Sequence, residues 1–145
     1  SFFMMYNKQN HTTWDCKYHV AFIPKYRRKV LFGQVRKSLG NVFHDLAARK
    51  ESIIEEGHMM SDHVHMLLSI PPKYSVAQVV GFIKGKSAIW MAQNFDKKVR
   101  NFTGSSFWAR GYFVSTVGRD EELIRNYIRH QEEVDKQYEI QQSFF

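Results

Sequence analysis

The chain has 145 residues, and hydrophobic residues make up 43% of it, which suits one compact globular domain and leaves little room for two. No stretch approaches the roughly 20 apolar residues of a membrane span, so we expect a protein without a membrane segment. The formal net charge of +7 is unevenly spread, because residues 1–119 carry 18 Lys and Arg against 7 Asp and Glu, whereas residues 120–145 carry 3 against 7.

This basic body favours a polyanionic partner. The 22 aromatic residues add surfaces on which unpaired bases can stack, although most of them are expected in the core. The first residues lack the long apolar stretch of a signal peptide, which predicts a cytoplasmic protein.

The first predicted element is a strand from Trp14 to Ile23, in which apolar residues alternate with polar ones until Pro24 ends it. The next five residues place four cations around one tyrosine: Lys25, Tyr26, Arg27, Arg28 and Lys29. In a basic body this cluster suits contact with nucleic-acid phosphates, and a solvated loop is the other interpretation.

The following elements are read from apolar periodicity. They are a helix at 34–50, a strand at 52–60, a strand at 63–70, a helix at 75–95 with Ser75 as its N-cap, a strand at 107–117 and a helix from 120. Within the second helix, Lys84 and Lys86 face either a nucleic-acid backbone or solvent.

The order β-α-β-β-α-β with a trailing helix predicts an α+β fold. We expect an RRM/ferredoxin-like antiparallel sheet with two helices on one face, leaving the other face available for a site. Residues 1–145 would form a single domain, with a core at about 13–117 and an extra C-terminal helix at about 120–137.

Two histidines lie at the centre of the most informative strand. Side chains two apart on a strand share a face, so the apolar residues from Val64 to Ile70 point one way, and His63 and His65 point the other. This spacing suits two ring nitrogens gripping one divalent cation. Ordinary strand histidines bonded to neighbours or water would give the same short pattern.

Tyr127 and Gln131 form the second candidate pair. Being four residues apart, they share one face of the last helix, where they could offer a nucleophilic phenol and a metal-binding carbonyl oxygen. Tyr127 also lies at a packing interval with Leu123 and Val134, so a role in the core is the alternative. His130, beside Gln131, fits a surface position better than a ligand.

Taken together, these motifs resemble the single-tyrosine HUH transposases, small transposases of bacterial insertion sequences that move as single-stranded DNA. The resemblance runs from about residue 13 to 136. It is carried by motifs in the family's order, namely Cys16-Lys17-Tyr18-His19, Pro24-Lys25-Tyr26-Arg27-Arg28-Lys29, Asp62-His63-Val64-His65-Met66-Leu67, Lys84-Gly85-Lys86-Ser87, Phe107-Trp108, Ser115-Thr116-Val117-Gly118 and Tyr127-Ile128-Arg129-His130-Gln131.

The resemblance implies a specific chemistry. His63 and His65 match the histidine pair and Gln131 the third ligand, which together would hold Mg²⁺ or Mn²⁺. Tyr127 matches the nucleophile, which would attack phosphorus and leave a 5′-phosphotyrosine and a free 3′-OH. The sequence does not identify the group that activates the phenol.

The resemblance also implies partners. The substrate would be single-stranded DNA with imperfect hairpins at the element ends, contacted by the cations of residues 25–29. The protein would be a homodimer in which the last helix crosses over, so that Tyr127 of one subunit faces the histidines of the other. Gly118 is placed as the hinge, because glycine admits backbone angles that other residues resist.

Three other functions fit parts of the sequence. Another HUH nickase, a plasmid relaxase or a replication initiator, would share the nicking chemistry, but the short chain and its tyrosine helix after the sheet argue against it. A non-catalytic RRM-like module could hold single strands by stacking, yet it has no use for paired histidines. A metal hydrolase using water would turn over without a protein–DNA adduct.

Overall fold

The computed structural model of the chain describes residues 7–9, 12–25, 31, 33–94, 107–116 and 121–143. Its elements are β1 (Asn7–Gln9), β2 (Thr12–Trp14), β3 (Lys17–Phe22), α1 (Gly33–Arg49), β4 (Ile53–Met60), β5 (His63–Ser69), α2 (Val76–Asn94), β6 (Phe113–Ser115) and α3 (Glu121–Ser143). None of these described helices is long and apolar enough to cross a membrane.

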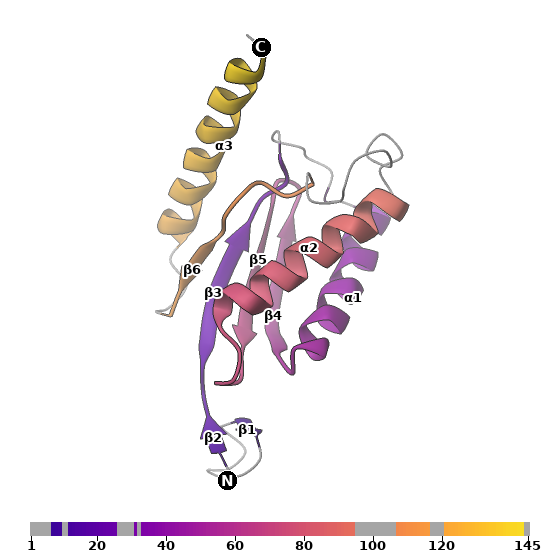
Figure 1. The fold of residues 1–145 in the computed structure, drawn as a ribbon, viewed down its shortest axis with the longest axis vertical. Coiled ribbons are helices and arrows are strands. Elements are labelled where there is room, and N and C mark those ends of the chain that lie inside the picture. Colours follow the sequence, from indigo (N-terminus) through magenta and orange to yellow (C-terminus); the bar gives the residue numbers. More distant parts are fainter. Residues whose placement is uncertain are drawn as a thin grey trace.

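Four strands form an antiparallel sheet in the order β4-β5-β3-β6, and β1 and β2 form a separate two-stranded hairpin. Helices α1 and α2 lie together against one face of the sheet, and α3 runs beside β6 (Figure 1). This arrangement confirms the predicted α+β fold with a trailing helix.

The two covering helices bury the apolar stripes that the sequence predicts. In α1 the buried residues include Leu39 and Phe43, and in α2 they include Val79 and Ile83, each set recurring at helical spacing. The predicted N-cap of α2 is confirmed as a reciprocal capping box. The amide of Gln78 donates to Ser75 Oγ at 3.0 Å, and the amide of Ser75 donates to Gln78 Oε1 at 2.8 Å.

The main core lies between these helices and one face of the sheet. Aromatic rings fill its centre, with Phe22 packed edge-to-face against both Phe43 and Trp108. The indole Nε1 of Trp108 donates to Ser87 Oγ of α2 at 2.9 Å, which satisfies a polar group buried in this core.

A second, smaller cluster lies apart from the main core. It joins Ala21 and Ile23, Ala109, and two residues of α3, Ile124 and Ile128. Because Ala21 lies between Val20 and Phe22 of the main core, its side chain points to the other face of β3. Helix α3 therefore packs on the face of its own sheet that α1 and α2 leave open.

The structure corrects three predicted element boundaries. The strand expected from Trp14 to Ile23 is broken at residues 15–16 into β2 and β3. The strand expected at 107–117 is only Phe113–Ser115. Before it, Trp108 forms an isolated bridge to Pro24, and Gly111 has a φ of +79° that interrupts the extended chain. The last helix continues to Ser143, beyond the expected end near residue 137.

Candidate metal and nucleophile site

Strand β5 has the predicted two faces. Val64, Met66 and Leu68 are buried in the main core, which confirms the orientation predicted from alternation. His65 lies opposite Ala21 of β3 and His58 of β4 in the strand registers, so its ring lies on the face that α3 partly covers.

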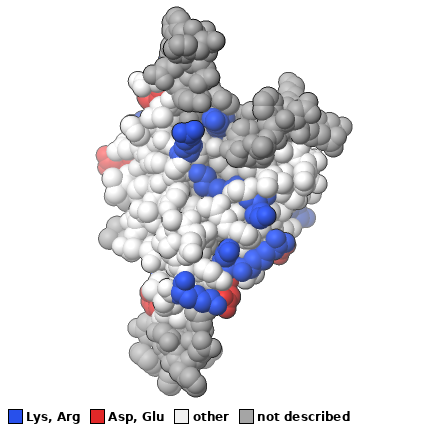
Figure 2. Space-filling model, viewed as in Figure 1, with Lys and Arg blue, Asp and Glu red and all other residues white. Residues whose placement is uncertain are grey.

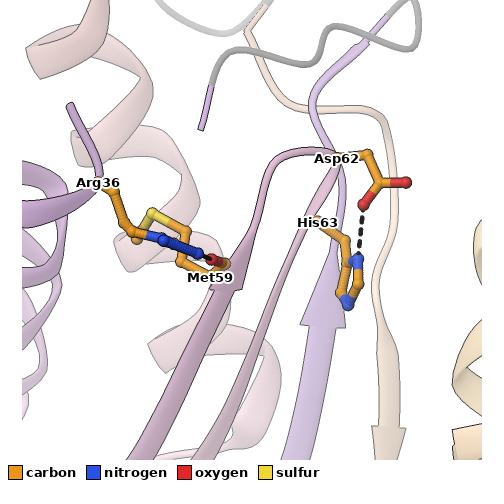
Figure 3. A network of polar contacts seen from close by, with 4 residues as sticks. All are labelled: Arg36, Met59, Asp62 and His63. Atoms are coloured by element: carbon orange, nitrogen blue, oxygen red, sulfur yellow. Dashed lines mark hydrogen bonds and ion pairs between the residues drawn. The ribbon is translucent and has the colours of Figure 1, made fainter. Parts of the chain in front are cut away.

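His63 is oriented by the residue that precedes it. Asp62 Oδ1 accepts a hydrogen bond from His63 Nδ1 at 2.9 Å, and the ring's other nitrogen points away from this carboxylate (Figure 3). The bond fixes the proton on Nδ1 and leaves the lone pair on Nε2, which is the pattern of a carboxylate-supported metal ligand. The His63 side chain is 12% exposed, so the ring is largely shielded.

The turn that carries Asp62 is held from two sides. Arg36 of α1 donates from Nε and Nη2 to the carbonyl oxygen of Met59 at 2.8 and 2.5 Å, at the end of β4 (Figure 3). The amide of Leu31 donates to the carbonyl of Ser61 at 3.3 Å. These bonds fix the backbone from which His63 projects.

His65 is only 4% exposed and belongs to a cluster of imidazoles. Its Nε2 lies 3.2 Å from Nδ1 of His19, and its ring centroid lies 6.2 Å from that of His58, whose Nε2 contacts Glu56 at 2.6 Å. If His65 is the donor to His19, its own lone pair is on Nδ1. His19 then supports His65 as Asp62 supports His63.

A hollow of about 420 Å³ opens beside this cluster, between α1 and β4. Arg36, Phe43 and His44 of α1 line one side, and the lining extends to Met60 and His65. Val64 and Met66 of the main core also line the hollow, so it lies on the side of the sheet that α1 covers, whereas the His65 ring lies on the other face.

Tyr127 is half-buried on α3, and its hydroxyl oxygen is shielded from solvent. Its ring packs at the edge of the small cluster formed with α3, with its centroid 6.1 Å from that of Phe113 on β6. The structure thus shows the packing role that the sequence allowed for Tyr127, and its role as a nucleophile stays a prediction.

Gln131 lies one turn beyond Tyr127. Its Nε2 donates to the carbonyl oxygen of Arg110, so the carboxamide has its nitrogen directed to the backbone and its oxygen on the opposite side. The oxygen is the atom that could ligate a hard cation.

One face of the sheet thus carries all four predicted residues of the site. Ala21 lies opposite His65 in the register and packs in the cluster that contains Ile128 and borders Tyr127. Neighbouring strands are about 4.8 Å apart, which places the histidine strand one step from the strand on which α3 rests. In the described part of the chain, no three His, Cys, Asp or Glu side chains are grouped to hold a metal.

The predicted cationic contacts differ in their surroundings. Lys86 is exposed, whereas Lys84 is partly buried and donates from Nζ to the carbonyl oxygens of Ala109 at 2.8 Å and Gly111 at 2.5 Å. Burial lowers the pKa of Lys84 from 10.5 to about 8. Lys25 is half-buried, and its amide donates to the carbonyl of Phe107 at 2.8 Å.

The remaining predicted residues, Tyr26 to Lys29 and Gly118, lie outside the described residues. Among the described ones, Lys and Arg side chains cross the face that α1 and α2 cover, with few acids between them (Figure 2). The DNA-contact assignments stay predictions.

Two side chains that border the site have contacts there that sequence reasoning missed. His19 could have been found from alternation, which places it on the same face of β3 as Ala21. The inward direction of Lys84 could have been found from helical spacing, because it lies four residues from each of the buried Val80 and Ala88. Its carbonyl partners have no such signal, since they come from a segment without regular structure 25 and 27 residues away.

Comparison with known proteins decides the family. The family model described as "Transposase IS200 like" matches residues 12–131. The chain belongs to the IS200-like transposase family. The transposase for insertion sequence element IS200 of Salmonella typhimurium is 44% identical over 126 residues, which cover 87% of this chain and 83% of that protein. The ISDra2 transposase TnpA of Deinococcus radiodurans is 31% identical over 119 residues, covering 81% and 85%.

Solved structures agree with this assignment. A crystal structure from Deinococcus radiodurans R1, described as a transposase candidate, superposes on this IS200-like transposase with a TM-score of 0.76 at 28% identity, covering 86% of this chain and 97% of that one. A REP-associated tyrosine transposase gives a TM-score of 0.51 at 11% identity, covering 84% and 68%, and so shares the fold. The resemblance noted in the sequence is confirmed.

Proposed function

We propose that this IS200-like transposase cleaves and rejoins single-stranded DNA at the ends of its insertion sequence through a 5′-phosphotyrosine at Tyr127. One observation carries the proposal. Helix α3, which carries Tyr127 and Gln131 one turn apart, packs on the sheet face that bears the paired histidines.

The proposed step balances as a transesterification. Tyr127 Oη attacks phosphorus, the bond from phosphorus to the 3′ oxygen breaks, and the leaving oxygen takes up a proton to become a 3′-OH. The phosphodiester energy is kept in the tyrosine ester, so the 3′-OH of a second strand can reverse the step without ATP. The pKa of an ordinary tyrosine is about three units above neutral, so a group in the site must take the phenolic proton.

The donor set fits a divalent cation. His63 would bind through Nε2, because Asp62 holds its Nδ1 proton, and Gln131 would bind through Oε1, because its Nε2 donates to Arg110. His65 would complete the set, with His19 bonded to its other ring nitrogen. Mg²⁺ or Mn²⁺ bound there would polarise the phosphate and offset the charge that develops on it.

The chain's own residues would prepare this site. Asp62 and His19 fix the two imidazoles, and the contact with Phe113 limits the positions of the Tyr127 ring. The shielding of the phenol and of His65 would keep bulk water from competing with the tyrosine for phosphorus.

We propose single-stranded DNA with hairpin ends as the partner. The REP-associated tyrosine transposase, which shares the fold, is bound to a REP hairpin in its structure. The basic body of this chain and the Lys and Arg side chains across its helical face suit such a partner (Figure 2). The reaction would take place in the cytoplasm, where the host DNA is found.

We further propose a homodimer whose active sites are shared. In the single chain, α3 packs on its own sheet, so exchange of this helix between subunits would break the contacts of Ile124 and Ile128 and remake them on the partner. Gly118, which precedes α3, would serve as the hinge of that exchange.

A covalent-adduct assay tests the chemistry. The protein is incubated with labelled single-stranded DNA carrying the element ends and with Mg²⁺ or Mn²⁺, and the products are separated on a denaturing gel. We expect a shifted protein band that requires the metal and single strands and is absent in Tyr127→Phe and His65→Ala.

Two matched variants control for nonspecific damage. Tyr112→Phe removes another half-buried phenol, and His44→Ala removes an exposed imidazole on α1, so both should still form the adduct. Cleavage without an adduct would instead indicate a hydrolase that uses water. Binding to verified element ends without cleavage would indicate a non-catalytic single-strand-binding module.

A further inference from the structure

A short segment, Ala109–Gly111, is held between α2 and α3. From α2, Lys84 Nζ donates to the carbonyl oxygens of Ala109 and Gly111, and from α3, Gln131 Nε2 donates to the carbonyl of Arg110 between them. Three consecutive carbonyls are thus bound by two helices that lie on different faces of the sheet.

The same segment is also fixed to the end of β3. The amide of Ala109 donates to the carbonyl of Ile23 at 2.9 Å, and its buried methyl group packs in the cluster with Ile124 and Ile128 of α3. Gly111 has a φ of +79°, a conformation that side chains disfavour, so the chain turns sharply where Lys84 binds it.

Lys84 is placed to fix the direction of these carbonyls. Its ammonium lies 5.9 Å from the ring centroid of Phe22, so it reaches towards the aromatic core and not into solvent. Partial burial of this amine is costly unless its protons are bonded, and the two carbonyls supply that bonding. Without Lys84, both carbonyls would lack their donor and the segment could turn.

We propose that Lys84 is a positioning residue for the metal ligand Gln131, acting through the carbonyls of Ala109–Gly111. This role for Lys84 rests on the function proposed above, since it requires Gln131 Oε1 to bind the cation. Lys84 holds the backbone, the Arg110 carbonyl holds the Gln131 amide nitrogen, and the amide oxygen is thereby kept towards the site.

The role predicted for Lys84 from the sequence, binding of DNA phosphates, has a different consequence. If Lys84 bound a phosphate, Lys84→Met would weaken DNA affinity and leave the reaction at saturating DNA unchanged. A positioning role affects the metal affinity and the reaction rate at saturation instead.

The first measurement is Mn²⁺ binding without DNA, by titration calorimetry, in the full chain. We expect Lys84→Met to weaken Mn²⁺ binding by about tenfold, the lower end for removal of an outer partner of a metal ligand. Lys37→Met is the matched control, because it removes an exposed lysine of α1 by the same substitution and should bind Mn²⁺ like the unchanged protein.

The second measurement tests the route of the effect. If Lys84 acts through Gln131, adding Lys84→Met to Gln131→Ala should weaken Mn²⁺ binding no further. Additive effects of the two substitutions would overturn the proposed route. Equal Mn²⁺ affinity in Lys84→Met and Lys37→Met would overturn the proposal itself, as would a decrease of DNA affinity alone.

Lys84→Arg keeps the test usable if Lys84→Met does not fold. It retains a cation with several donors, so its Mn²⁺ affinity should fall between those of the unchanged protein and Lys84→Met. If Lys84→Met does not fold, Lys84→Arg is compared with Lys37→Arg, and equal affinities again overturn the proposal. The covalent-adduct assay shows separately whether the proposed function fails. In that case Tyr127→Phe would still form the adduct, or the unchanged protein would form none.

Discussion

Replacing Ile128 with alanine should release α3 from the sheet while the main core stays folded. Ile128 is 6% exposed, and it packs in the small cluster with Ala21, Ile23, Ala109 and Ile124. None of these residues belongs to the main core between the sheet and α1 and α2. The perturbation is therefore confined to the contact that docks α3.

The expected loss of docking free energy follows from the number of buried carbon atoms that the substitution removes. Isoleucine loses three carbon atoms on change to alanine, and at about 0.8 kcal/mol for each the docking free energy falls by about 2.4 kcal/mol. A residual cavity would raise the cost within the usual range of about 2–5 kcal/mol. The lower figure corresponds to about a 60-fold increase in the undocked population.

Hydrogen exchange followed by mass spectrometry measures this directly. Peptides from residues 121–134 of Ile128→Ala should exchange about 60-fold faster, since α3 then undocks more often, while peptides from β3 and β5 should keep their protection. Val134→Ala is the control on the same helix, because Val134 is 44% exposed and should leave the exchange unchanged.

Two results would refute the reasoning. Unchanged protection of α3 in Ile128→Ala would show that other contacts dock the helix. An equal decrease of protection in α3 and β5 would show that α3 and the sheet unfold as one unit. Formation of the DNA adduct should fall together with the protection of α3, because Tyr127 and Gln131 are positioned by the same docking.

Three further predictions concern single contacts. Ser75→Ala should lower the free energy of unfolding by about 1 kcal/mol, measured by urea denaturation, because the amide of Gln78 loses its cap; no change would contradict the capping box. Burial lowers the pKa of Lys84 from 10.5 to about 8, so between pH 8 and 10.5 the unfolded state binds more protons than the folded state. In this pH range the free energy of unfolding of the unchanged protein should therefore rise with pH relative to that of Lys84→Met. A difference between the two proteins that stays flat from pH 8 to 10 would contradict that pKa. His19→Phe should weaken Mn²⁺ binding by about tenfold in calorimetry, since His65 loses its outer partner, and an unchanged affinity would show that His19 does not support this ligand.

The sequence was sufficient for the fold and for the faces of its elements. Alternation in β5 and helical spacing in α1 and α2 depend on local backbone geometry, so they can be read without knowing the partners. The predicted capping residue Ser75 is confirmed for the same reason, because a cap and its bonded amides lie within one turn. Spacing likewise singled out the histidine pair and the Tyr127 and Gln131 pair as candidates, but their roles came from the family resemblance and stay predictions.

Only the tertiary structure decided which distant groups meet at the site. His19 and His65 are 46 residues apart in sequence and become neighbours through the pairing of β3 with β5. Helical spacing places Lys84 beside the buried Val80 and Ala88, but the carbonyl oxygens that its ammonium binds come within reach only because the chain turns at Gly111. Contacts of this kind depend on packing between elements, which local periodicity does not encode.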